Sequence, residues 1–262
     1  MTLTNSDFWE NPPWGKGDKK YRLGLTPINQ EKWLNRKLDK ELLKYKKDLL
    51  SSSYNSVIAV TDDSINAQKY LADIFGINST EYPDLIAELS LNIQDDLCLM
   101  ESKNEQRLLA ASICSPSYWD LKTKIGKSLT EIHKPVTSLD SKIGKRISTF
   151  IRQAPVMKPF ARQNWLIHGD TIRFHLSEEK FLKSHPSTWF IRSEKETLCR
   201  FHEDYSLFTI NVLFEPLKTI FDYPEQKQNL ILSLEGLDKD EADYFGGNKK
   251  INILLEYLTE QL

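Results

Sequence analysis

The chain has 262 residues, of which 35 are basic and 37 acidic, and 40% of its residues are hydrophobic. This composition is typical of a globular protein, and a chain of this length can bury a core without disulfides or a structural metal. No apolar run approaches the roughly 18 residues that a membrane-spanning helix needs. The first residues contain neither a basic leader nor an apolar stretch. We therefore expect a cytoplasmic protein that contacts no membrane.

The cysteines and the charges narrow the classes further. Cys98, Cys114 and Cys199 are odd in number and far apart, which predicts buried free thiols. Two blocks are basic: residues 16–48 carry eleven Lys or Arg against five acids, and residues 122–152 carry eight against two. No nucleic-acid recognition motif accompanies them. We expect no nucleic-acid partner, and interpret the blocks as solvated faces or as a docking surface for an acidic redox partner.

The first part of the chain has helical periodicity. Thr26 and Pro27 form a good helix start, and apolar residues recur at helical spacing to residue 50. A second helix is predicted from Ser64 to a stop at Gly76, and a third over 84–96.

Short strands dominate from residue 97 to residue 214. Residues 97–100 and 107–114 predict a hairpin, and 115–136 a loop with a short helix that Pro135 ends. A basic helix follows over 140–152. Four further strands are predicted at 163–168, 171–176, 187–201 and 205–214, and the tail is helical again, with an apolar stripe from Ile251 to Leu258. The expected architecture is α+β, an antiparallel β-sheet core wrapped by N-terminal and C-terminal helices.

The sequence lacks the common hydrolase, nucleotide-binding and zinc-protease motifs. One histidine nevertheless suits a cofactor. His133 ends the short helix just before the rigid Pro135, and a haem pocket needs one imidazole whose approach the backbone fixes. A surface or capping histidine explains the same pattern.

His168 and Asp170 suggest a different metal centre. With a third ligand from His175, His185 or His202, this pair would form the facial triad of a non-haem iron oxygenase. Gly169 followed by Asp170 is also an ordinary hairpin turn between two predicted strands. The sequence leaves both interpretations open.

Polar residues recur on one face of two predicted strands. Arg192 and Glu194 share a face, and an arginine with a carboxylate in one pocket can hold an anionic cofactor group and a hydrogen-bond-donating substrate. A surface ion pair is the alternative. Arg162 and Asn164 point away from Trp165, which we expect to pack in the core. An apolar slot for a cofactor would come from aromatic residues on these strands: Trp165, Trp189, Phe190, Phe208 and Phe214.

Several segments, taken in order, resemble one protein family. They are IQDDLCLM (93–100), CSPSYWDLKTKIGKSLTEIHKPV (114–136), RQNW (162–165), FIRSEKETLCRF (190–201) and SLFTINVLFEPL (206–217). This set is similar to the haem-dependent oxidative N-demethylase alpha-subunit-like family, and RLGLTPINQEKWL (22–34) is similar to its N-terminal region.

The resemblance implies a fold and a reaction. It implies a PAS-like haem-binding domain over 93–217, with an N-terminal helical region (1–92) packed on it and a C-terminal helical segment (218–262). The expected cofactor is haem b. The implied activity is that of a monooxygenase that oxidises a small N-methyl amine with O₂, giving the demethylated amine and formaldehyde. Electrons would come from a flavin and iron–sulfur reductase subunit, and the family's tested members act on dimethylamine.

The resemblance also assigns residues. His133 becomes the iron ligand; the cofactor-binding residues become Arg162, Asn164, Trp165 and Arg192; the catalytic residues become Glu194 and Thr197. The chain departs from the family's pattern in four places, where Thr137 and His202 each replace a proline and Lys195–Glu196 replaces Arg–Gln. His202 lies either near the pocket as a second ligand or at the surface. A non-catalytic haem or small-ligand sensor on the same sheet stays open.

Overall fold

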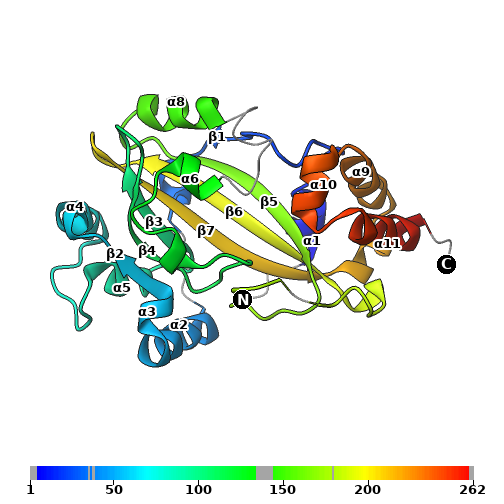
Figure 1. Cartoon of the computed structure of the whole chain (residues 1–262), viewed down its shortest axis with the longest axis horizontal. Helices are drawn as coiled ribbons and strands as arrows, with labels where there is room; N and C mark the ends of the chain where they lie inside the picture. The colour runs from blue at the N-terminus through cyan, green and yellow to red at the C-terminus, as the bar shows by residue number, and fades with distance from the viewer. Residues whose placement is uncertain (1–4, 35, 37–38, 134–143, 179, 260–262) are drawn as a thin grey trace.

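A computed structural model describes residues 5–34, 36, 39–133, 144–178 and 180–259. Within these ranges, seven strands form one antiparallel sheet in the order β1-β5-β6-β7-β3-β4-β2, so the chain is α+β as expected (Figure 1). The strands are β1 (Thr26–Pro27), β2 (Ile58–Val60), β3 (Asp96–Glu101), β4 (Leu108–Ser112), β5 (Phe160–His168), β6 (Phe190–Arg200) and β7 (Tyr205–Pro216).

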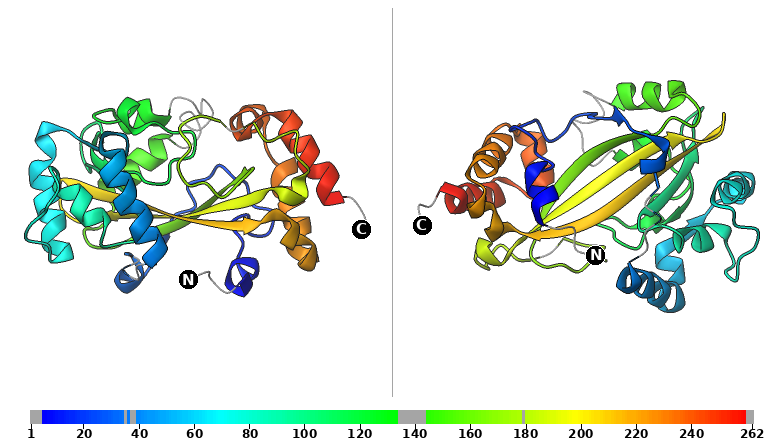
Figure 2. Two further views of the ribbon diagram at one scale, coloured as in Figure 1. Left: turned by 90° about the horizontal axis from the view of Figure 1, so that it is seen from below. Right: turned by 180° about the vertical axis from the view of Figure 1, so that it is seen from behind.

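The helices gather at the two ends of the sheet and over its faces. In Figure 1, α2 to α5 lie at one end and α9 to α11 at the other; Figure 2, with the sheet near edge-on, shows α6 and α8 on one face and α1 on the opposite face. The helices are α1 (Asn5–Glu10), α2 (Lys40–Ser52), α3 (Tyr54–Val57), α4 (Ile65–Phe75), α5 (Leu85–Ser90), α6 (Leu129–His133), α8 (Lys145–Gln153), α9 (Pro224–Glu235), α10 (Lys239–Phe245) and α11 (Asn248–Thr259). The short 3-10 helices are η1 (Gln30–Lys32), η2 (Asp62–Ser64), η3 (Leu121–Thr123), η5 (Pro186–Thr188) and η6 (Leu217–Asp222).

Strand alternation divides the side chains of β5, β6 and β7 between two faces. On β6, Ile191 and Cys199 belong to apolar cores, whereas Arg192, Glu194 and Glu196 point to the opposite face. One core packs strand residues such as Trp165 and Ile191 against α1, α9, α10 and α11. A second core joins β3 and β7 to α2, α4 and α5, and a third, smaller cluster lies around β3 and β4. The face that carries the charged residues is left for a site.

A buried lysine ties α2 to the sheet. Lys46 Nζ donates to the backbone carbonyls of Ser90 (3.0 Å), Ile93 (3.0 Å) and Asp95 (2.8 Å). Three acceptors satisfy the three N–H groups of an ammonium, which is what makes its burial tolerable. The contact fixes the chain where α5 leads into β3.

Several expected elements are present. The helix after Ser64 is α4, and Gly76 ends it in the left-handed conformation (φ 72°) that a residue without a Cβ adopts at little cost. The hairpin is β3–β4, and the apolar stripe of the tail is the buried face of α11. All three cysteines are buried and free. No described helix combines the length and the apolar character that a bilayer crossing requires.

Other expectations were wrong. Thr26 and Pro27 form β1, paired with Ala161 and Phe160 at the edge of the sheet, and the helix begins only after Asp39, whose carboxylate accepts from two amides of the first turn. Strand pairing therefore outweighs a local helix-start signal. The third helix ends at Ser90, because the chain has to extend into β3.

The predicted strand 171–176 is also absent from the fold. Among the described residues, one bridge between Ser117 and His175 is the only strand pairing of this segment, and residues 169–170 do not form a hairpin turn. Instead, the Asp170 carboxylate accepts from the Ile172 amide and contacts the His175 ring. The proposed division of the chain into 1–92, 93–217 and 218–262 stays a prediction; the edge strands β1 and β2 come from its first part.

Candidate functional site

A cavity of about 300 Å³ lies against the polar face of the sheet. Its apolar wall is formed by strand residues such as Leu198 and Phe208, by Leu129 and Ile132 of α6, and by helix α8. The two residues that α8 contributes are Ile147 and Ile151. The volume is within the range of small-molecule sites.

The polar wall is a continuous chain of hydrogen bonds. Lys20 Nζ donates to Asn164 Oδ1 (2.8 Å), and Asn164 Nδ2 donates to Glu194 Oε2 (2.9 Å). Arg192 Nε then donates to Glu194 Oε1 (2.9 Å). Strand register accounts for the contact at the centre, because Asn164 lies directly opposite Glu194 across β5 and β6. Arg192 and Asn164 therefore hold one oxygen each of the Glu194 carboxylate.

One nitrogen of the Arg192 guanidinium does not take part in these hydrogen bonds. The residue is only 1% exposed, and its Nη2 donates to the backbone carbonyl of Ser115. Its Nη1 is buried and has no hydrogen-bond partner among the described residues. Since a buried guanidinium N–H without a partner is costly, this atom fits an anionic group of a molecule in the cavity.

A second pair of charged residues, Arg162 and Glu196, lies two residues further along the same two strands. Arg162 Nε donates to Glu196 Oε2 (2.5 Å), and Arg162 Nη1 donates to the Arg22 carbonyl (3.0 Å). Burial raises the pKa of the Glu196 carboxyl above its ordinary value, and the positive charge of Arg162 opposes that shift. The pair brings no net charge to the cavity.

Asp96 shapes the same wall from β3. Its carboxylate accepts from the amides of Cys114 (2.9 Å) and Ser115 (2.8 Å). Burial is the largest effect and raises the pKa of this carboxyl. By fixing the turn after β4, Asp96 holds the Ser115 carbonyl where Arg192 reaches it.

The structure unites four of the expected site residues: Arg162, Asn164, Arg192 and Glu194 all line the cavity. Trp165 and Thr197 do not, because alternation turns them to the other face of the sheet. Trp165 packs edge-on against Trp14 (5.9 Å) and Phe245 (5.3 Å). Neither side chain faces this cavity, and the expected roles of Trp165 with a cofactor and of Thr197 with a substrate stay predictions.

The Thr197 hydroxyl instead belongs to a buried network. It lies 2.7 Å from Thr209 Oγ1, which donates to Asp95 Oδ2 at 2.9 Å. The expected aromatic slot does not form the wall of this cavity: of its five members only Phe208 lines the cavity, and Trp189 belongs to the same core cluster as Trp165.

Of the histidines with described side chains, His168 and His175 lie close together, with ring centroids 5.7 Å apart. His168 Nε2 lies 3.0 Å from Ser117 Oγ, and burial, followed by the charge of Arg192, lowers the pKa of His168 to about 3. His175 contacts Asp170, so the H-x-D pair has two separate partners. Among the described residues, no group of three His, Cys, Asp or Glu side chains is arranged to hold a metal ion.

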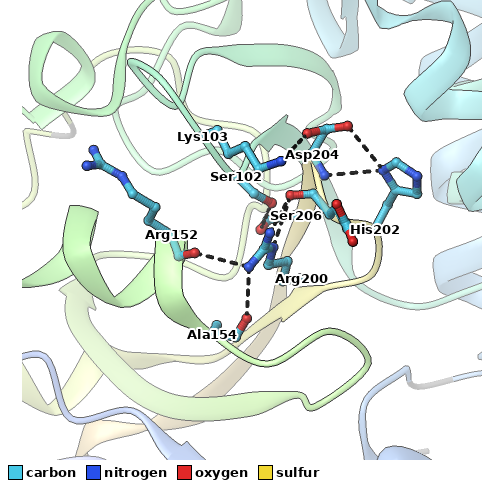
Figure 3. A network of polar contacts seen from close by, with 9 residues as sticks. Ser102, Lys103, Arg152, Ala154, Arg200, His202, Asp204 and Ser206 are labelled. Carbon is cyan, nitrogen blue, oxygen red and sulfur yellow. Dashed lines mark hydrogen bonds and ion pairs between the residues drawn. The ribbon is translucent and has the colours of Figure 1, made fainter.

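His202 lies in the turn between β6 and β7 and does not line the cavity (Figure 3). It stacks on Tyr70, with ring centroids 4.3 Å apart. The sequence left two positions open for His202, near the pocket or at the surface, and the structure places it away from the pocket.

His133 is the last residue of α6, whose Leu129 and Ile132 contact the cavity. Its side chain, together with Pro135, Thr137 and residues 134–143 as a whole, lies outside the described part of the chain. Its expected role as iron ligand therefore stays a prediction.

Arg200 anchors the helix that covers the cavity (Figure 3). Its Nη1 donates to the carbonyls of Arg152 (3.1 Å) and Ala154 (3.5 Å) at the C-terminal end of α8. Its Nη2 donates to the Glu203 carbonyl (2.6 Å). A cation at this end also interacts favourably with the helix dipole, so Arg200 stabilises α8 in its position.

Sequence analysis missed part of the site. Lys20, Tyr21, Leu23, Leu25 and Tyr244 reach the cavity from segments without any local signal. Asp96 does have a local signal: it belongs to an acidic pair directly before an apolar strand, and buried acids need partners.

One family model matches most of the chain. The family is described as haem-dependent oxidative N-demethylase, alpha subunit-like, and the match covers residues 30–254. This range includes every strand from β2 to β7. No curated protein sequence matches the chain significantly.

Proposed function

Because the chain belongs to the haem-dependent oxidative N-demethylase alpha-subunit-like family, we propose that it binds haem b in the cavity and oxidises a small N-methyl amine with O₂. The products would be the demethylated amine and formaldehyde. The proposal includes a PAS-like relationship of the sheet, a cytoplasmic location and a flavin and iron–sulfur reductase as partner. The description of the family as an alpha subunit favours such a partner.

The single observation in the structure that supports this proposal most is the buried, unpaired Nη1 of Arg192, a residue that lines the cavity. A haem carries two carboxylates, and an arginine N–H is a strong donor for a carboxylate. The opposite wall is apolar, as a porphyrin ring requires. Arg162 would be a second donor near the same face.

The iron needs only one ligand from the protein, since the porphyrin supplies four. We propose His133 for this role. The position of helix α6 supports this role, because its residues Leu129 and Ile132, in the turn before His133, line the cavity. The rigid Pro135 that follows would restrict the approach of the imidazole.

Bound haem would supply the oxidising chemistry; the side chains would bind and orient the amine. Glu194 keeps acceptor capacity beyond the bonds from Arg192 and Asn164, because an ionised carboxylate has about four lone-pair sites. It would therefore accept a hydrogen bond from the N–H group of the amine. The apolar side chains of α6 and α8 would exclude water from the methyl group.

The proposal predicts a red protein. Titration of the purified chain with haemin should produce a Soret band at one equivalent, and His133→Ala should shift or abolish it. His185→Ala is the matched control, since His185 caps η5 and lies outside the cavity lining. A chain that stays colourless, or an unchanged band in His133→Ala, would refute haem binding through this residue.

Turnover is tested separately. Formaldehyde release from dimethylamine, with NADH and a flavin-dependent reductase as electron source, should require both haem and Glu194. Haem binding without amine-dependent formaldehyde release would instead identify a non-catalytic haem sensor.

A further inference from the structure

Lys20 is a charged group of the cavity to which the proposed reaction gives no role. It lies on the segment before β1, lines the cavity, and reaches across β5. Its Nζ donates to Asn164 Oδ1 at 2.8 Å and to the backbone carbonyl of Trp165. No other described residue accepts from it. Two acceptors are thus available to this nitrogen.

The number of acceptors distinguishes two protonation states. An ammonium carries three N–H groups, whereas a neutral amine carries two N–H groups and one lone pair. Lys46 has three carbonyl partners, one for each N–H group that an ammonium would carry. Lys20 has two, which satisfy a neutral amine and leave its lone pair free.

The surroundings of Lys20 favour the neutral form. Burial is the largest effect and lowers the pKa of this amine to about 7. The charges of Arg162 and Lys250 act in the same direction, and those of Glu194 and Glu196 oppose it. The rings of Tyr21 (5.0 Å) and Trp165 (4.9 Å) lie beside the nitrogen, and the attraction of a ring face for an ammonium also opposes the shift.

We propose that Lys20 is a carbonyl-reactive amine, which binds a small aldehyde in the cavity as an imine. Lysines that are desolvated in apolar pockets are the ones that form such adducts. The Lys20 nitrogen attacks the carbonyl carbon, and the resulting carbinolamine loses the carbonyl oxygen as water. One amine and one aldehyde give one imine and one water, with no oxidant or reductant.

This inference rests on the geometry of Lys20 and does not require haem. Formaldehyde, the product of the proposed oxidation, is one aldehyde of the class. The reaction with Lys20 is reversible by hydrolysis, so the site would retain the aldehyde briefly before release.

The test uses the purified chain without added haemin, so that its result is independent of the oxidation. The protein is treated at pH 7 with a limiting amount of ¹³C-formaldehyde and cyanoborohydride, which reduces an imine to a stable methylamine. Peptide mass spectrometry then measures methylation at each lysine. Lys19 is the exposed neighbour in sequence, and Lys46 is the buried lysine with three acceptors.

We expect Lys20 to be methylated about tenfold or more faster than Lys19 at pH 7, because desolvation favours the neutral, nucleophilic form of an amine. The ratio should fall as the pH approaches 10. Lys20→Arg, which keeps donors for both acceptors, should remove the fast site and leave Lys19 unchanged. Equal rates at Lys19 and Lys20, or a Lys20 rate that rises with pH as steeply as that of Lys19, would overturn the proposal.

Discussion

Removal of the Arg192 side chain would leave the Glu194 carboxylate buried without its charge partner. The two residues are 1% and 7% exposed, and Arg192 Nε lies 2.9 Å from Glu194 Oε1. Loss of one member of a buried ion pair costs about 3–5 kcal/mol, because the remaining charge is still desolvated. Arg192→Met, which keeps an unbranched apolar chain, should therefore lower the free energy of unfolding by about 3–5 kcal/mol.

Urea unfolding at pH 7, followed by tryptophan fluorescence, measures this loss. In thermal unfolding the same loss of stability corresponds to a decrease of roughly 6–20 °C in Tm, since chains of about 150–250 residues lose about 2–4 °C per kcal/mol. Glu194→Leu and the double variant complete a mutant cycle. The double variant should be less destabilised than the sum of the two single variants, since it leaves no unpaired charge.

An exposed pair provides the matched control. Lys103 Nζ lies 2.8 Å from Asp204 Oδ1, but the two side chains are 47% and 52% exposed. Water screens this pair, so Lys103→Met should cost at most about 1 kcal/mol. If Arg192→Met costs no more than Lys103→Met, or if the cycle is additive, the buried pair does not stabilise the fold in the way we argue.

Three further predictions concern titration and the cavity cover. The pKa of His168 is about 3 in the folded chain and 6.5 when unperturbed, so the unfolded chain binds the extra proton and stability falls as the pH is lowered through that window. His168→Gln should reduce the loss of stability that urea unfolding measures between pH 7 and pH 5. The pKa of Lys20 is lowered from 10.5 to about 7, so its contribution makes stability rise with pH above 7, and Lys20→Met should flatten that rise between pH 7 and 8.5 in the same assay. Arg200→Ala should cost about 1–3 kcal/mol and raise amide hydrogen exchange in α8, with exchange in α11 unchanged; equal exchange in α8 would contradict the anchoring role.

The sequence predicted the long strands and their faces well. Alternation along β6 follows from Ile191 and Arg192 alone, since an apolar and a charged residue cannot share one environment. The same argument identified Arg162 and Asn164 on one side of β5 and Trp165 on the other. Assigning Trp165 to the cofactor conflicted with this alternation, and the structure follows the alternation.

The pairing of these residues could not be predicted from local pattern. Whether Asn164 meets Glu194 depends on the register between β5 and β6, since the two residues are thirty positions apart in the chain. The length of the connection between the strands does not determine that register. Lys20 is a clearer case: it precedes β1 in a polar stretch, and only tertiary packing brings it to the cavity. The helix expected at Thr26 failed for the same reason, because the partner that turns this segment into a strand is Ala161.

The register also explains how the chain accommodates its departure from the family's motif. Glu196 stands where the resemblance implies an uncharged glutamine, and an added carboxylate on a buried face would ordinarily be costly. β5 places Arg162 directly opposite Glu196, and the two form their own ion pair at 2.5 Å. The new charge is therefore neutralised within one rung of the sheet, and Arg192 keeps its unpaired Nη1. The unpaired Arg192 donor thus persists beside a substitution that would otherwise have competed for it.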